Sequence, residues 1–155
     1  MITFRSDNLQ KEPINLNDLV QNLIDNLTPI AEMKDIELKF KQEDKIELFG
    51  DFILIQNAIR NLIDNALKYS PYEGIITVSI GTSPISFLEI HDQGPGFPPK
   101  DLDNLTMRFT RGQNSNGIVG SGLGLTIAKD VANAHGAKLQ LSNHEKGGAC
   151  VTLLF

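Results

Sequence analysis

The chain has 155 residues, 41% of them hydrophobic and 21% charged, which is typical of one globular domain. Its net charge of −5 argues against a nucleic-acid partner and against direct contact with an anionic membrane, because both surfaces attract clustered Lys and Arg. No apolar run approaches the roughly 20 residues of a membrane-spanning helix. The single cysteine, Cys150, excludes an intrachain disulfide, and its apolar neighbours predict a small buried side chain in a reducing, cytoplasmic setting.

Apolar spacing divides the first part of the chain into two helices and two strands. Residues 16–27 repeat with a helical period, and Pro29 is expected to kink or end that helix. Residues 36–40 alternate apolar and charged side chains, the pattern of a half-buried strand, and residues 46–48 predict a short partner strand. A long helix is expected over residues 54–70.

The rest of the chain predicts four strands and one helix. Residues 76–80 and 88–92 alternate in hydrophobicity and predict two strands joined by a turn. Residues 123–135 predict a helix that stops at Gly136, and residues 139–155 predict a final pair of strands. This order of elements predicts an α+β fold, a two-layer sandwich in which helices cover one face of a mixed, mostly antiparallel sheet.

Three asparagines recur every fourth residue along the helix at 54–70. Asn57, Asn61 and Asn65 fall on the arc that the apolar side chains leave free, and Lys68 shares it. Asn is a poor helix former, so three in register indicate a polar surface that contacts something bound. The alternative is a solvated helix face, although such faces usually carry Glu, Lys and Arg.

A carboxylate ends the inward stripe of the strand at 88–92. Alternation puts Asp92 on the side of Leu88 and Ile90, which must meet the helices. A carboxylate in that position is costly unless it is hydrogen-bonded. Two kinds of partner are open, the turn amides of the loop from Gly94 to Gly96 and the amino group of a bound adenine. Beside the asparagine helix and a second glycine loop, adenine recognition is favoured.

Two glycine-rich segments follow the asparagine helix. Residues 92–97 read Asp-Gln-Gly-Pro-Gly-Phe, and residues 117–125 read Gly-Ile-Val-Gly-Ser-Gly-Leu-Gly-Leu. The second segment leads into the predicted helix, whose N-terminal N–H groups attract phosphate. A Walker loop is excluded because Ile118 and Val119 stand where Lys and Ser or Thr are required. A dinucleotide fingerprint is excluded because no strand precedes Gly120.

The asparagine helix, Asp-x-Gly-x-Gly and Gly-x-Gly-x-Gly occur in that order, with Arg-Phe-Thr-Arg at residues 108–111 between the two glycine segments. This combination resembles the ATP-binding catalytic domain of the sensor histidine kinases, which share a superfamily with DNA gyrase, heat-shock chaperone ATPases and mismatch-repair ATPases. The resemblance covers residues 16–155 and implies the Bergerat-type ATP-binding fold. It implies ATP and Mg²⁺ as cofactors, and transfer of the γ-phosphoryl group to a histidine as the reaction.

The resemblance also implies roles for particular residues. Asn65 would bind Mg²⁺, which usually keeps several waters and takes other ligands from phosphates. Asn61 and Lys68, two candidate catalytic residues, would contact the phosphates, and Asn61 could instead contact metal-bound water. Tyr69 would face the adenine, whereas Asn57 matches no motif position. The remaining nucleotide-binding residues would be Asp92, Gly94 and Gly96 in the adenine pocket, with Gly120, Ser121, Gly122, Leu123 and Gly124 in the phosphate loop.

Residues 105–117 match the lid that covers the nucleotide in histidine kinases. Arg111, the third candidate catalytic residue, would stabilise the γ-phosphate, because guanidinium matches phosphate oxygens in a bidentate fork. The alternative for Arg111 is a solvated loop arginine. Thr106 stands where the family typically has Phe and Met107 where it often has an acid, which predicts looser docking of the lid.

Asn61 separates the reaction classes of the superfamily. The hydrolytic relatives and the anti-sigma-factor serine kinases have a Glu four residues before the magnesium Asn, where a carboxylate can act as general base. An amide cannot take up a proton usefully, which favours transfer to a histidine and predicts weak hydrolysis of ATP. The alternatives are a serine kinase of the anti-sigma type, an inactive nucleotide-binding module and a purely structural interaction domain.

The phosphoacceptor is expected on another domain, because none of His91, His135 and His144 begins the His-Glu/Asp-x-Arg/Lys motif of an acceptor helix. Residues 1–155 are expected to be a catalytic domain, with residues 1–15 as the exit from a preceding dimerisation and phosphoacceptor domain. That domain of the same kinase would be its partner, and a response-regulator receiver domain would act downstream. We expect the isolated domain to be a monomer and, where the parent is a membrane-bound sensor, part of its cytoplasmic region.

Overall fold

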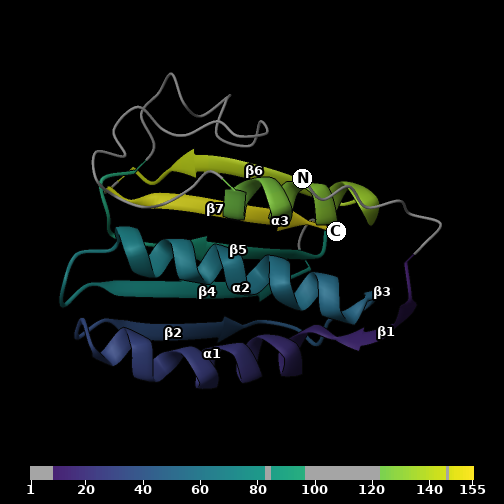
Figure 1. The fold of residues 1–155 in the computed structure, drawn as a ribbon, viewed down its shortest axis with the longest axis horizontal. Coiled ribbons are helices and arrows are strands. Elements are labelled where there is room, and N and C mark those ends of the chain that lie inside the picture. Colours follow the sequence, from purple (N-terminus) through teal and green to yellow (C-terminus); the bar gives the residue numbers. More distant parts are fainter. Residues whose placement is uncertain (1–8, 83–84, 97–122, 146) are drawn as a thin grey trace.

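Three helices lie over one face of a five-stranded sheet in the computed structural model of the protein, which describes residues 9–82, 85–96, 123–145 and 147–155 (Figure 1). The elements of the described chain follow one another in the order predicted from hydrophobic spacing, with one additional strand at the start. They are β1 (Lys11–Asn15), α1 (Leu16–Glu32), β2 (Glu37–Gln42), β3 (Glu47–Asp51), α2 (Phe52–Tyr69), β4 (Ile75–Gly81), β5 (Phe87–His91), α3 (Leu123–Ala134), β6 (Lys138–Asn143) and β7 (Ala149–Leu154).

The five-stranded sheet has the strand order β2-β4-β5-β7-β6. Only the pair β2–β4 is parallel, and the other three pairs are antiparallel. In Figure 1, α1 lies in front of β2, α2 in front of β4 and β5, and α3 in front of β6 and β7. The predicted α+β sandwich, with a mixed and mostly antiparallel sheet and helices on one face, is therefore confirmed.

The strand predicted at 46–48 exists as β3, but its expected partner was wrong. It pairs antiparallel with β1 in a separate two-stranded sheet and not with β2. The start of α1 explains this, because the Leu16 amide donates to the Ile46 carbonyl at 2.9 Å. The Asn17 side chain also accepts from the Ile46 amide at 2.9 Å and donates to the Asp44 carbonyl at 2.9 Å. These bonds hold the connection after β2 at the start of α1 and place β3 beside β1.

Residues 11–15, which the sequence assigned to the exit from a preceding domain, form β1 and thus take part in this fold. The Asn15 side chain then accepts from the Asp18 amide at 3.1 Å and caps α1. The helix continues through Pro29 to Glu32, so of the two predicted effects of the proline, a kink or an end, the end was wrong. Only three residues follow Pro29 in the helix, and one of them, Ala31, is buried in the core.

The core lies between the helices and the inner face of the sheet. Every inward position of α2 predicted from its spacing is buried except Leu54, which is half-buried. The inward stripes of β4 and β5 are almost fully covered, with Ile76, Ile80 and Leu88 at 0% exposure. Because α2 is held along its whole length, its opposite face keeps a fixed orientation relative to β5. That face carries the asparagines.

We predict that Ile59→Ala lowers the free energy of unfolding by about 2–5 kcal/mol, because Ile59 is 0% exposed and its removal leaves a cavity in the core. Ile53→Ala is the matched control on the same helix, since Ile53 is 61% exposed and its truncation should change stability by less than about 0.5 kcal/mol. Urea unfolding of both variants tests this. Equal losses at the two positions would contradict the packing of α2 described above.

Candidate functional site

Asp92 follows β5 and has a buried carboxylate, with 5% of the residue exposed. Its Oδ1 accepts two backbone hydrogen bonds, from Gly94 at 2.8 Å and from Ala149 at 3.1 Å. The Asp92 amide in turn donates to the Ala149 carbonyl at 3.0 Å, so the residue is fixed to the start of β7. The predicted turn bond to Gly94 is therefore present. It uses Oδ1 alone, and no described residue donates to Oδ2.

Burial raises the pKa of the Asp92 carboxyl. The hydrogen bonds from Ala149 and Gly94 and the positive charge of His91 act in the opposite direction and offset part of the increase. In the described part of the chain no buried side-chain nitrogen or oxygen lacks a hydrogen-bond partner. A donor that approaches Oδ2 would relieve the desolvation that burial imposes.

The glycines of the Asp92 loop make room for other parts of the protein. A Cβ at Gly94 would collide with the carbonyl oxygen of Tyr69 at the end of α2. Gly96 has φ +80°, where side chains are strained, and a Cβ there would lie 2.8 Å from Oδ1 of Asn143. The family resemblance implied only that these glycines belong to the adenine pocket, and the contact between Gly94 and α2 was not predicted.

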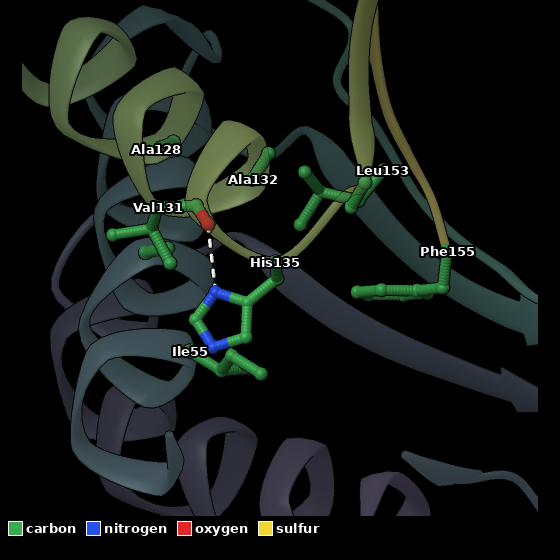
Figure 2. A pocket seen from close by; sticks show the side chains of 9 residues that line it. Ile55, Ala128, Val131, Ala132, His135, Leu153 and Phe155 are labelled. Carbon is green, nitrogen blue, oxygen red and sulfur yellow. Dashed lines mark hydrogen bonds between the residues drawn. The ribbon is translucent and has the colours of Figure 1, made fainter. Parts of the chain in front are cut away.

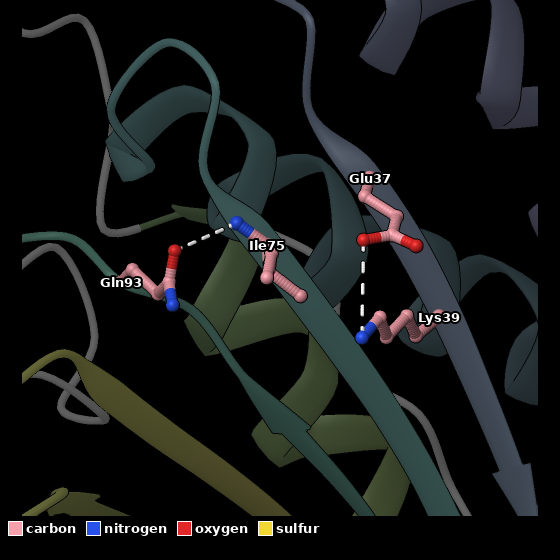
Figure 3. Close-up of polar contacts among 4 residues, drawn as sticks. All are labelled: Glu37, Lys39, Ile75 and Gln93. Atoms are coloured by element: carbon pink, nitrogen blue, oxygen red, sulfur yellow. Dashed lines mark hydrogen bonds and ion pairs between the residues drawn. The ribbon is translucent and has the colours of Figure 1, made fainter.

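Gln93 fixes the loop from a third direction. Its side-chain oxygen accepts from the Ile75 amide at the start of β4 at 2.8 Å (Figure 3). The loop that carries Asp92 is thus attached to β7 through Ala149, to the end of α2 through Gly94 and to β4 through Gln93. These contacts hold the Asp92 carboxylate in one orientation before any ligand is present.

The asparagine face of α2 changes in exposure along the helix. Asn57 is exposed, whereas Asn61 and Asn65 are half-buried. Among the described residues, no hydrogen bond engages the amide of Asn61 or of Asn65. Lys68 is exposed and Tyr69 is half-buried at the end of the helix, where burial raises the pKa of the Tyr69 hydroxyl.

Lys34 contacts the end of α2 and was not singled out in the sequence. Its Nζ donates to the carbonyl oxygens of Leu67 at 2.8 Å and Ser70 at 2.9 Å. The same ammonium lies 5.3 Å from the centre of the Tyr72 ring. A single lysine in the turn after α1 gives no sequence signal for this contact, because its partners are backbone carbonyls more than thirty residues away.

The three histidines have structural partners. His135 donates from Nδ1 to the Val131 carbonyl at 2.7 Å (Figure 2). Its Nε2 accepts from the Asp51 amide at 3.0 Å, which holds the end of α3 at the start of α2. It lines a small apolar pocket with residues such as Ile55 and Phe155, and this pocket offers little to a polar ligand. His91 and His144 stack with ring centres 4.3 Å apart.

Several predicted site residues lie outside the described residues. They are Arg111, Gly120, Ser121 and Gly122, together with the lid positions Thr106 and Met107. Leu123 and Gly124 are the first two residues of α3, so the helix begins at the residue where the sequence predicted its start. In the described part of the chain no helix has the length and apolar character needed to cross a membrane. Cys150 is buried in β7 as predicted, and burial raises the pKa of its thiol.

Comparison with known proteins identifies the family to which the chain is similar. Residues 50–155 match the model of the histidine kinase-, DNA gyrase B- and HSP90-like ATPases. The sensor histidine kinase HprS of Escherichia coli K12 is 38% identical over 81% of this chain and 27% of its own length. The sensor protein QseC of the same organism is 34% identical over 92% of this chain and 31% of its own length. This chain therefore spans about a quarter to a third of these relatives.

Solved structures agree with the sequence comparison. The mycobacterial sensor histidine kinase MprB matches with a TM-score of 0.81 and 28% identity, covering 93% of this chain and 95% of that chain. The cytoplasmic segment of the histidine kinase QseC matches with a TM-score of 0.75 and 25% identity, covering 97% of this chain and 82% of that chain. The fold around Asp92 and α2 is thus the fold of histidine kinase ATPase domains.

The raised pKa of Asp92 predicts a pH-dependent stability difference from Asp92→Asn. Above the raised pKa the buried carboxylate is ionised and lowers stability, and this cost disappears as the pH falls through the raised pKa. At about pH 7 the Asn variant should therefore have the higher Tm, and the difference should shrink on acidification.

Thermal unfolding across a pH series measures this difference. Asp25→Asn, which removes an exposed carboxylate of α1, controls for the loss of a negative charge. A difference between wild type and Asp92→Asn that stays constant with pH would show that burial does not raise the pKa of Asp92.

Proposed function

The chain belongs to the family of histidine kinase-, DNA gyrase B- and HSP90-like ATPases, and we propose that it binds ATP with Mg²⁺ and donates the γ-phosphoryl group to a histidine. The observation that carries the proposal is the Asp92 carboxylate, whose Oδ1 is held by two amides while Oδ2 receives no bond from the described chain. The names of the relatives, which are sensor kinases, support the reaction class.

Adenine fits the Asp92 loop chemically. Its exocyclic amino group donates a hydrogen bond, and Oδ2 is an ionised acceptor in a site that is largely removed from water. Guanine carries an oxygen at the corresponding ring position, which would place an acceptor against the carboxylate. Asp92 thus selects for adenine by attraction and against guanine by repulsion. Gly94 and Gly96 form the wall of the pocket, and Tyr69 faces the base from α2.

The polar face of α2 supplies the phosphate side of the site. Asn65 offers a half-buried amide oxygen that no described residue occupies, which suits a metal that keeps most of its ligands from water and phosphate. Mg²⁺ bound there would neutralise charge on the phosphates. Asn61 and Lys68 lie one turn to either side on the same arc, and we assign them to the phosphates. Arg111 and the loop Gly120, Ser121, Gly122, Leu123 and Gly124 complete the proposed site.

Transfer to a histidine follows from what the site lacks among its described residues. Asn61 stands where a general base would be needed to activate water or a serine hydroxyl, and its amide cannot take a proton. An imidazole nitrogen is already a nucleophile near neutral pH. In the proposed step its lone pair forms the new P–N bond while the bond from the γ-phosphorus to the bridging oxygen breaks, and ADP leaves with that electron pair. The side chains of this chain hold the nucleotide in line and exclude water.

The acceptor histidine belongs to a separate domain in this proposal. His135 uses both ring nitrogens within the fold, and His91 and His144 stack on each other. We therefore assign the partner as the dimerisation and phosphoacceptor domain of the same kinase, with a receiver domain downstream. The QseC structure is described as a cytoplasmic segment, which supports a cytoplasmic location for this domain.

Calorimetric titration with a non-hydrolysable ATP analogue tests the binding site. We expect micromolar binding that Mg²⁺ strengthens, no detectable binding to Asp92→Asn, and loss of the strengthening by Mg²⁺ in Asn65→Ala. Asn57→Ala is the matched control, because it removes the same amide from an exposed position of the same helix. The proposal fails if the wild-type chain does not bind, and the metal assignment fails if Asn57→Ala and Asn65→Ala behave alike.

Phosphotransfer tests the reaction. Incubated with ATP and Mg²⁺, this chain alone should show weak hydrolysis and no labelled histidine, whereas adding the phosphoacceptor domain of the same kinase should give acid-labile, base-stable phosphate on that domain. Heat-denatured chain serves as the control for non-enzymatic labelling. Phosphate on a histidine of this chain, or rapid steady-state turnover without an acceptor, would contradict the proposed division of roles.

A further inference from the structure

Lys34 contacts the end of α2 with both its side chain and its backbone. Its ammonium donates to the carbonyls of Leu67 at 2.8 Å and Ser70 at 2.9 Å, and its own carbonyl accepts from the Glu73 amide at 2.9 Å. The ammonium also lies 5.3 Å from the centre of the Tyr72 ring, within range of a cation–π interaction. The turn after α1 is thereby hydrogen-bonded to the turn after α2.

The end of α2 needs such a partner because it has no glycine cap. Its C-cap, Ser70, is extended with φ −71° and ψ 141°, and Pro71 follows. The Ser70 amide donates to the Ala66 carbonyl at 2.9 Å, but the next carbonyls have no further amide in the helix. The Lys34 ammonium donates to one of them and places a positive charge at the negative end of the helix dipole.

The last turns of α2 are also where the proposed nucleotide contacts gather. Asn65, Lys68 and Tyr69 lie within the final five residues of the helix. The carbonyl of Tyr69 lies so close to Gly94 that no side chain would fit between them. A displacement of this turn would therefore move the proposed metal ligand and the Asp92 loop relative to each other.

We propose that Lys34 is a positioning residue for the nucleotide site, which holds the last turn of α2 at the correct distance from the Asp92 loop. It does not touch the nucleotide in this proposal and acts through Asn65 and Tyr69. The inference rests on the proposed function, because it assigns Lys34 a role in the same site.

Lys34→Met keeps the length of the side chain and removes the donor. We expect it to weaken binding of ADP in the presence of Mg²⁺ about tenfold, because two charge-assisted hydrogen bonds are lost. We also expect the strengthening of ADP binding by Mg²⁺ to fall, since Asn65 is displaced. Lys34→Arg should restore affinity to within about threefold, because guanidinium can donate to both carbonyls.

Lys39→Met is the matched control. This variant also removes one positive charge. In the wild-type chain the Lys39 ammonium pairs with Glu37 at 3.8 Å on the exposed face of β2 (Figure 3). Its removal should leave ADP affinity and the effect of Mg²⁺ unchanged. All measurements are made at a temperature where circular dichroism shows that each variant is folded, so that a lower Tm does not itself reduce binding.

The outcomes distinguish a failure of the proposed function from a failure of the positioning role of Lys34. Absence of ADP binding by the wild-type chain would overturn the proposed function. Wild-type binding with unchanged affinity and unchanged Mg²⁺ effect in Lys34→Met, despite a lower Tm, would show that Lys34 only stabilises the fold and would overturn the positioning role. If Lys34→Met does not fold, Lys34→Gln replaces it, since the amide can still donate to one carbonyl. An intermediate loss of affinity in that variant supports the role, and wild-type affinity overturns it.

Discussion

The hydrogen bonds that hold the Asp92 carboxylate are the constraint on which the site depends. A buried ionised group is costly unless it is hydrogen-bonded, and here two backbone amides share one of its oxygens while the other receives no hydrogen bond from the described residues. The residual cost appears as the raised pKa of the carboxyl. The fold thus maintains an acceptor that is directed and incompletely satisfied, and this is the state in which a donor from a ligand contributes most.

The groups that hold Asp92 in place come from distant parts of the chain, which the fold brings together at the end of β5. Ala149 lies at the start of β7, and its register beside β5 is set by an unbroken antiparallel ladder down to the C-terminus. Gly94 packs on the end of α2, whose other face is buried in the core along its length. Because the core fixes α2 and the ladder fixes β7, the carboxylate is positioned by elements that are packed in the core or paired in the sheet.

Periodicity in the sequence predicted the helices, the strands other than β1 and the inward position of Asp92, because each depends on local spacing. It also predicted the buried face of α2, and with it the opposite arc that carries Asn61 and Asn65. It did not predict the pairing of β3 with β1, which depends on hydrogen bonds between the Asn17 side chain and a connection almost thirty residues later. The amide of Ala149 and the ammonium of Lys34 were missed for the same reason. Each of these bonds involves a backbone group, and backbone groups are identical at every position and leave no pattern in the side chains.

The contact between Tyr69 and Gly94 joins the two halves of the proposed site. One half, on α2, carries the amides assigned to metal and phosphate, and the other half carries the carboxylate assigned to adenine. Since no side chain would fit between the helix and the loop at this contact, it sets the separation between the two halves. A nucleotide whose base and phosphates match that fixed separation would meet a pre-organised site and would lose less free energy to reordering the protein. In the proposed site, the separation between helix and loop would therefore contribute to selectivity together with the chemistry of Asp92.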